Sequence, residues 1–210
     1  NSEPRGAMPM MPAQGIRNVS LPPTALKLMR QPGVKNPGLK LRSIFTGGES
    51  LGGELHGWVR ETFGIDAHEV FGQTECNLVV GSNSNLFPIR AGSMGKATPG
   101  FDVRIVNDRG EELPRGQRGV IGVRQPCPCT MIEYWKNPEA TAKKYAGEFL
   151  LTGDLGVQDE DGYFWYVSRE DDVITTAGYR VGPAEIEHTL MKHPAVAMSG
   201  GVGIPDPIPT

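Results

Sequence analysis

The sequence lacks the features that mark membrane, secreted and nucleic-acid-binding proteins. No apolar run among its 210 residues approaches the roughly 18 that a membrane-spanning helix needs. Its start, Asn1-Ser2-Glu3-Pro4-Arg5, does not resemble a signal peptide. The formal net charge is -3 and the basic residues do not cluster, so no surface for binding a polyanion is predicted. We therefore expect no membrane span and no nucleic-acid partner, while the oligomeric state stays open.

Cysteine is scarce, and its spacing excludes the usual cross-links. There are three cysteines, an odd number. Cys127 and Cys129 are too close for a relaxed disulfide, and Cys76 stands alone. Structural metal sites need a second pair of ligands at a spacing such as Cys-x-x-Cys, and the sequence has none. These features predict reduced thiols in a cytoplasmic protein.

Residues 1–90 have the pattern of an α/β layer. Helix formers follow Pro22-Pro23-Thr24, and apolar residues recur at helical spacing over residues 51–63. Strands are predicted before and after this second helix, at residues 39–45 and 65–71. Strand, helix and strand in this order predict parallel strands, and ligands of such sheets bind beyond the carboxyl ends of the strands.

The pattern changes to short strands and tight turns over residues 91–170. Hairpin turns ending in Gly110 and Gly162 separate the predicted strands, which indicates an antiparallel β subdomain. Residues 171–210 then begin a small α+β domain, with a helix at 184–192 and a strand at 195–204. The fold class is therefore α/β: part of a mixed α/β large domain, an antiparallel β subdomain and the start of a small C-terminal domain.

The segment Phe71-Gly72-Gln73-Thr74-Glu75 could bind a nucleotide. An aromatic ring can stack on a base, glycine lets the backbone approach closely, and a threonine hydroxyl can bond a phosphate oxygen. A glutamate can hold Mg²⁺, which prefers carboxylate oxygens. The structural alternative is that Thr74 caps a helix that begins after it.

Two further segments allow a ligand or a structural role. Thr152-Gly153-Asp154 lies between apolar residues, so Asp154 could be a partly desolvated carboxylate that accepts both hydroxyls of a ribose. Its alternative is a turn aspartate that bonds its own backbone. The turn at Gly47, Gly48 and Glu49 could lie against an adenine ring, or could be a glycine-rich turn before a helix cap.

Residues 168–187 complete a pattern that resembles the adenylate-forming enzymes, the superfamily of acyl-CoA synthetases, luciferases and nonribosomal peptide adenylation domains. The segment Ser168-Arg169-Glu170-Asp171-Asp172 and the later Gly178-Tyr179-Arg180 match the family's Gly-Arg-x-Asp-Asp and Gly-Tyr-Arg. Ser168 departs from the family, which usually has glycine there; serine adopts a positive φ only at a cost. The sequence around Phe71–Glu75 and residues 134–141 is similar to short- and medium-chain acyl-CoA synthetases, and we assign residues 134–141 to surface structure.

The resemblance implies a role for each matching residue. It implies ATP or AMP binding by Gly47, Gly48, Glu49, Phe71, Gly72, Gln73, Thr74, Asp154 and Arg169. Thr74 and Glu75 would be catalytic, with Glu75 holding Mg²⁺, and Asp171 would be a hinge. Ala177, Gly178 and Tyr179 would line the channel for coenzyme A.

The expected activity is that of an ATP-dependent acid–thiol ligase, which makes an acyl-adenylate from a short- or medium-chain fatty acid and transfers the acyl group to CoA. The family's Gly/Ser/Thr-rich phosphate loop and its lysine have no counterpart in these 210 residues, nor has Gly-x-x-x-x-Gly-Lys-Ser/Thr. We therefore expect an internal segment of a larger synthetase, inactive by itself. The alternatives are an adenylation domain that loads a carrier protein and a non-catalytic nucleotide-binding module.

Overall fold

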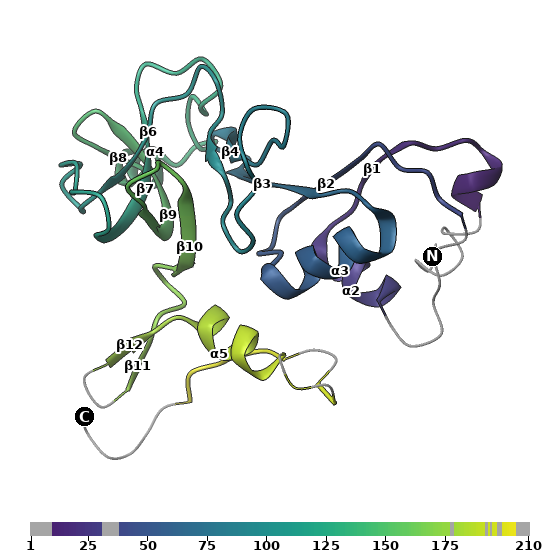
Figure 1. The fold of residues 1–210 in the computed structure, drawn as a ribbon. Helices are drawn as coiled ribbons and strands as arrows, with labels where there is room; N and C mark the ends of the chain where they lie inside the picture. The colour runs from purple at the N-terminus through teal and green to yellow at the C-terminus, as the bar shows by residue number, and fades with distance from the viewer. Residues whose placement is uncertain are drawn as a thin grey trace. The chain divides into compact units, whose positions relative to one another are not determined.

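The computed structural model describes residues 10–30, 38–176, 179–191, 193, 195, 196 and 199–204 (Figure 1). The chain divides into two compact units. The first unit comprises residues 1–72 and 80–96, and the second comprises residues 73–79 and 97–210. The domain boundaries inferred from the sequence at residues 90 and 170 stay predictions.

The first unit contains a parallel arrangement of strands with helices against it. Strands β1 (Asn18–Ser20), β2 (Ser43–Gly47) and β3 (Ala67–Gln73) pair in parallel, and the sheet order continues with β4 (Asn77–Gly81) and β5 (Lys96–Ala97). Helices α2 (Pro23–Met29) and α3 (Gly53–Phe63) lie beside one another (Figure 1). The parallel layer predicted from the sequence is confirmed.

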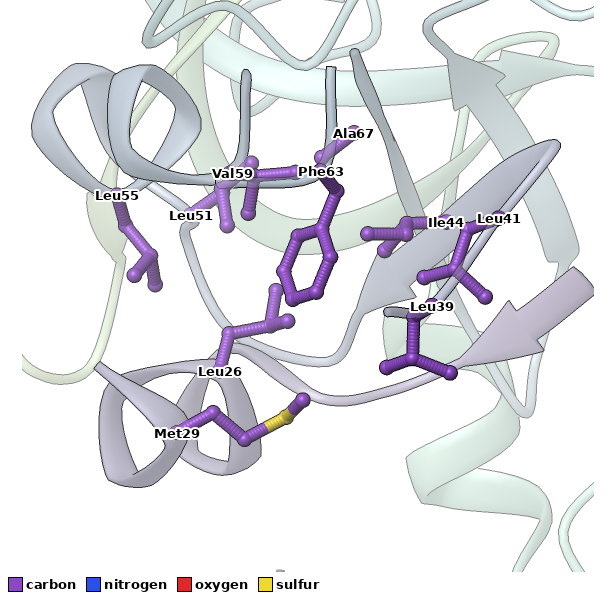
Figure 2. Close-up of a cluster of buried hydrophobic side chains, with 10 residues drawn as sticks. All are labelled: Leu26, Met29, Leu39, Leu41, Ile44, Leu51, Leu55, Val59, Phe63 and Ala67. Atoms are coloured by element: carbon purple, nitrogen blue, oxygen red, sulfur yellow. The ribbon is translucent and has the colours of Figure 1, made fainter. Parts of the chain in front are cut away.

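The core of this unit forms between the helices and the strands. Figure 2 shows side chains of α2 and α3 turned toward Ile44 of β2 and Ala67 of β3. Its buried members are apolar residues of α2 and α3, of β2 and β3, and of the segments that lead into β2 and α3: Leu26, Met29, Leu39, Leu41, Ile44, Leu51, Leu55, Val59, Phe63 and Ala67. Burial of this set removes apolar surface from water and fixes α3, hence also the loop between β2 and α3.

The second unit is built on an antiparallel sheet. Its order is β10-β9-β7-β6, with β6 (Val103–Val106), β7 (Arg118–Arg124), β9 (Phe149–Gln158) and β10 (Phe164–Arg169). The short β8 (Tyr145–Ala146) pairs with β9 and follows α4 (Pro138–Lys143). The antiparallel β subdomain expected from the sequence is therefore present.

Strand β9 continues through residues 152–154, the segment that lies between apolar residues in the sequence. In the pairing with β7, Val120 lies opposite Leu155 and Gly122 opposite Leu151, so β9 bulges between these pairs. Gly153 takes a φ of 78°, a left-handed conformation that glycine adopts without a steric penalty, and this lets the strand continue.

The chain after β10 contains a short hairpin and a helix. Strands β11 (Ile174–Thr176) and β12 (Tyr179–Val181) pair antiparallel, and α5 (Pro183–Leu190) follows. The predicted strand at 195–204 is absent from its described residues 195, 196 and 199–204. This segment contains Gly200, Gly201 and Gly203, which have low strand propensity and no side chain to pack. No described helix is long and apolar enough to cross a membrane.

Candidate active site

The turn between β3 and β4 carries two of the predicted site residues. Residues 74–76 form the turn, closed by a hydrogen bond from the Cys76 amide to the Gln73 carbonyl oxygen at 3.1 Å. Thr74 is exposed and Glu75 is partly buried. A strand follows the turn, so the alternative that Thr74 caps a helix is wrong.

Asp154 is a buried carboxylate that a glutamine holds in place. Asp154 is 5% exposed and lies on the bulged part of β9. Gln73 Nε2 donates to Asp154 Oδ2 at 2.6 Å and to the Thr152 carbonyl oxygen at 2.9 Å. The alternative of a turn aspartate bonded to its own backbone is therefore wrong, because Asp154 lies in a strand and its carboxylate contacts other elements.

Arg169 lies opposite Asp154 and provides the nearby positive charge. The two residues are partners in the pairing of β10 with β9, and Arg169 Nη1 lies 3.7 Å from Asp154 Oδ1. Burial raises the pKa of Asp154, while the charge of Arg169 and the hydrogen bond from Gln73 oppose that rise. The carboxylate is thus desolvated but has a partner near each of its oxygens.

Asp171 follows the end of β10 and contacts the same arginine. Its Oδ1 accepts a hydrogen bond from Arg169 Nε at 3.1 Å, and this bond lowers the pKa of the exposed Asp171 carboxyl. Ser168 is 2% exposed and is not among the residues with positive φ, so its serine side chain causes no left-handed strain.

Glu75 contacts a segment to which the sequence analysis gives no site role. The Tyr134 hydroxyl donates to Glu75 Oε1 at 2.6 Å, and the Met131 amide donates to the Glu75 carbonyl oxygen at 2.7 Å. The hydrogen bond from Tyr134 lowers the pKa of Glu75, which burial opposes. The only available sequence signal was the family-like segment at residues 134–141, because pattern alone does not reveal a contact between residues 59 positions apart.

Lys144 places a second positive charge near Glu75 and Asp154. Its Nζ donates to the carbonyl oxygens of Thr152 at 3.1 Å and of Leu151 at 3.3 Å. Its charge contributes to lowering the pKa of Glu75 and also opposes the rise in the pKa of Asp154. An anionic group near Glu75 and Asp154 would therefore meet two cations, Lys144 and Arg169.

The remaining predicted nucleotide residues belong to the first unit. Gly47 ends β2, where a Cβ atom would lie 2.7 Å from the Val70 carbonyl oxygen, so close strand packing explains this glycine. Gly48 has a φ of 89°, and the Glu49 carboxylate accepts the Thr24 hydroxyl at 2.7 Å. The structural alternative for this turn needs a residue that caps α3. That residue is Gly52, which makes no side-chain hydrogen bond.

The predicted residues therefore fall into two groups. Phe71 and Gly72 are in β3 with the first unit, whereas Gln73, Thr74, Glu75, Asp154, Arg169 and Asp171 all belong to the second. Ala177 and Gly178 lie outside the described residues, and Tyr179 is the first residue of β12.

The described residues fit a Mg²⁺ ion that shares its coordination with the phosphates of a ligand, and not one held by protein side chains alone. None of their His, Cys, Asp and Glu side chains gather in threes as a metal cage would require. Proteins often bind Mg²⁺ through one or two carboxylates together with substrate phosphates. Glu75, whose pKa is lowered by the hydrogen bond from Tyr134 and which follows the exposed Thr74 in the turn, fits that second arrangement.

The chain belongs to the family of AMP-binding enzymes. The model of this family matches residues 4–135, which is more than half of the chain. The membership predicted from residues 71–75, 152–154 and 168–187 is thereby confirmed.

Within this family the chain is similar to acyl-coenzyme A synthetases. It is 45% identical over 171 residues to the mitochondrial acyl-coenzyme A synthetase ACSM5 of Mus musculus, covering 80% of this chain and 29% of the relative. It is 42% identical over 197 residues to the mitochondrial ACSM4 of Homo sapiens, covering 92% of this chain and 34% of the relative. The chain thus spans about a third of the length of these relatives.

Solved structures show the same fold. The anthranilate CoA ligase AuaEII in complex with anthranoyl-AMP superposes with a TM-score of 0.87 at 29% identity, over 96% of this chain and 39% of that one. The o-succinylbenzoate CoA synthetase of Bacillus subtilis, in complex with ATP and magnesium ion, has a TM-score of 0.81 at 27% identity, over 97% and 42%.

The predicted cytoplasmic location is wrong. The acyl-CoA synthetase relatives from mouse, rat and human are mitochondrial proteins. The prediction rested on unpaired cysteines, and the thiols of Cys76, Cys127 and Cys129 are indeed free. Free thiols indicate a reducing environment and do not distinguish one reducing compartment from another.

Proposed function

We propose that this chain is part of an AMP-forming acid–thiol ligase that activates a short- or medium-chain fatty acid with ATP and transfers the acyl group to coenzyme A. The observation that carries the proposal is the buried Asp154 carboxylate, held by Gln73 and faced by Arg169. The similarity to acyl-coenzyme A synthetases supports the choice of substrates.

The reaction has two steps. A carboxylate oxygen of the acid attacks the α-phosphorus of ATP, a P–O bond forms, and pyrophosphate leaves with the electron pair of the broken bond. The sulfur of the CoA thiol then forms a bond to the acyl carbonyl carbon and its proton passes to water, and AMP leaves with the electron pair of the broken C–O bond. Bound Mg²⁺ would shield the phosphate oxygens during the first step.

The residues of the second unit suit the nucleotide part of this chemistry. Asp154 accepts both ribose hydroxyls, and Arg169 orients Asp154 and contacts the ribose. The exposed Thr74 hydroxyl bonds a phosphate oxygen, and Glu75 holds Mg²⁺ together with the phosphates. Gln73 acts through Asp154, since its amide already donates to that carboxylate.

The other predicted residues complete the proposal. Phe71 and Gly72, with Gly47, Gly48 and Glu49, bind the adenine ring. Asp171 is the hinge at which the segment after β10 reorients between the two steps. Ala177, Gly178 and Tyr179 line the route of the CoA thiol.

Binding of AMP and of 2′,3′-dideoxy-AMP to the chain tests the central assignment. Asp154→Asn should weaken AMP binding by about tenfold or more, because hydrogen bonds to a charged group contribute about 1.5–3 kcal/mol each. The dideoxy analogue lacks both hydroxyls, so the same variant should bind it almost as the parent chain does. Isothermal calorimetry measures both affinities.

Glu160→Gln is the matched control, because it neutralises an exposed carboxylate in a turn of the same unit. An equal loss of affinity for AMP and for the dideoxy analogue in Asp154→Asn would show that Asp154 does not recognise the ribose.

A further inference from the structure

Glu75 is fastened at two points by the segment of residues 131–134. The Met131 amide donates to its backbone carbonyl oxygen at 2.7 Å, and the Tyr134 hydroxyl donates to its side-chain Oε1 at 2.6 Å. A hydrogen bond from a hydroxyl to a carboxylate at this distance is charge-assisted and among the stronger ones in proteins. The segment therefore fixes the Glu75 backbone and its side chain independently.

Tyr134 is itself held by α4. Its amide donates to Thr141 Oγ1 at 2.9 Å, and that hydroxyl donates to the Asn137 carbonyl oxygen at 2.9 Å. Asn137 caps the helix, its Oδ1 accepting the Ala140 amide at 3.1 Å. The tyrosine is therefore presented by a capped helix start.

Two further features show that this segment has a defined shape. The Tyr145 hydroxyl donates to the Met131 carbonyl oxygen at 3.1 Å, which ties the start of the segment to β8. Lys136 takes a φ of 53°, a conformation that a residue with a side chain holds only where its surroundings enforce it. The turn that follows Tyr134 is therefore held in a strained conformation by its surroundings.

We propose that Tyr134 is a positioning residue that holds Glu75 Oε1 so that Oε2 faces the metal-bound phosphates. This inference rests on the proposed role of Glu75 as the magnesium ligand. A free glutamate side chain samples several rotamers, whereas a carboxylate held at one oxygen presents the other in one direction. Residues 134–141 therefore support the site, in addition to forming surface structure.

A coupling experiment in the 210-residue chain tests the proposal. The probe is ATP with and without Mg²⁺, and the measured quantity is the gain in affinity that Mg²⁺ produces, determined by calorimetry. Tyr134→Phe should reduce this gain by about tenfold or more, the effect of one hydrogen bond to a charged group. Its affinity for AMP without Mg²⁺ should stay unchanged.

Tyr145→Phe is the matched control. It removes the same hydroxyl atom from a tyrosine that contacts the backbone of the segment and not Glu75. It should change the gain by less than twofold. If both tyrosine variants reduce the gain equally, general support of the segment is responsible, and the positioning role is overturned.

Glu75→Gln separates a failure of this inference from a failure of the proposed function. It should remove the gain from Mg²⁺, and adding Tyr134→Phe to it should then have no further effect. A full gain in Glu75→Gln would refute the metal role of Glu75 itself. Loss of the gain in Glu75→Gln but not in Tyr134→Phe would refute only the positioning role of Tyr134.

Discussion

Replacing Gln73 with methionine should destabilise the second unit in a pH-dependent way. The change keeps the length of the side chain but removes the donor that bonds Asp154 Oδ2 at 2.6 Å and the Thr152 carbonyl oxygen at 2.9 Å. A hydrogen bond to a charged group contributes about 1.5–3 kcal/mol, and one between neutral groups about 0.5–1.5 kcal/mol. At pH 7 the free energy of unfolding should therefore fall by about 2–4 kcal/mol.

The loss should be smaller in acid. Burial raises the pKa of Asp154 above its ordinary value of 3.8, so the native state binds this proton more tightly than the unfolded chain does. Stability then decreases as pH rises from 3.8 through the native pKa. Without Gln73 the charged form of Asp154 loses a partner, so the pKa of Asp154 in the native state rises further. The pH range over which stability decreases then extends upward. At pH 4 the loss should therefore approach that of two hydrogen bonds between neutral groups, about 1–3 kcal/mol.

Urea unfolding at both pH values measures the two losses, and carboxyl NMR follows the titration of Asp154. Gln117→Met is the matched control, because Gln117 is an exposed glutamine of the same unit. An equal loss at pH 4 and pH 7, or an Asp154 pKa that does not rise in the variant, would refute the reasoning.

Three more predictions concern other parts of the chain. Burial raises the pKa of Glu69 to about 7, so the free energy of unfolding of the parent chain should decrease between pH 5 and pH 8. Glu69→Gln keeps an acceptor for the Leu51 amide and should not show this decrease. Equal pH slopes of the two chains in urea unfolding would contradict this. Burial raises the pKa of the Cys76 thiol to about 11, so a thiol reagent should modify the other two cysteines in the native chain and Cys76 only after unfolding, as peptide mass mapping would show. Phe149→Ala should lower the free energy of unfolding by about 3–5 kcal/mol, because a ring that is 2% exposed leaves a cavity; a loss under 1 kcal/mol would show that the sheet collapses into the space.

Much of the fold follows from local patterns. The apolar spacing over residues 51–63 predicts α3, and the Asn137-Pro138 start predicts α4 with its cap. The boundaries differ more: the strand predicted at 39–45 is β2 at Ser43–Gly47. Local sequence indicates that an element exists, whereas its ends depend on pairing with a neighbouring strand.

The sequence by itself determined the family, the parallel and antiparallel halves, and the residue types of the candidate site. Only the tertiary structure decided which of these residues share a unit: Gln73 through Glu75 join Asp154 and Arg169, while Phe71 and Gly72 remain with the first unit. It also revealed Tyr134 as the partner of Glu75. The physical reason is that propensity and periodicity act within a few residues, whereas a hydrogen bond across 59 or 81 positions forms only when the sheet brings the two side chains together.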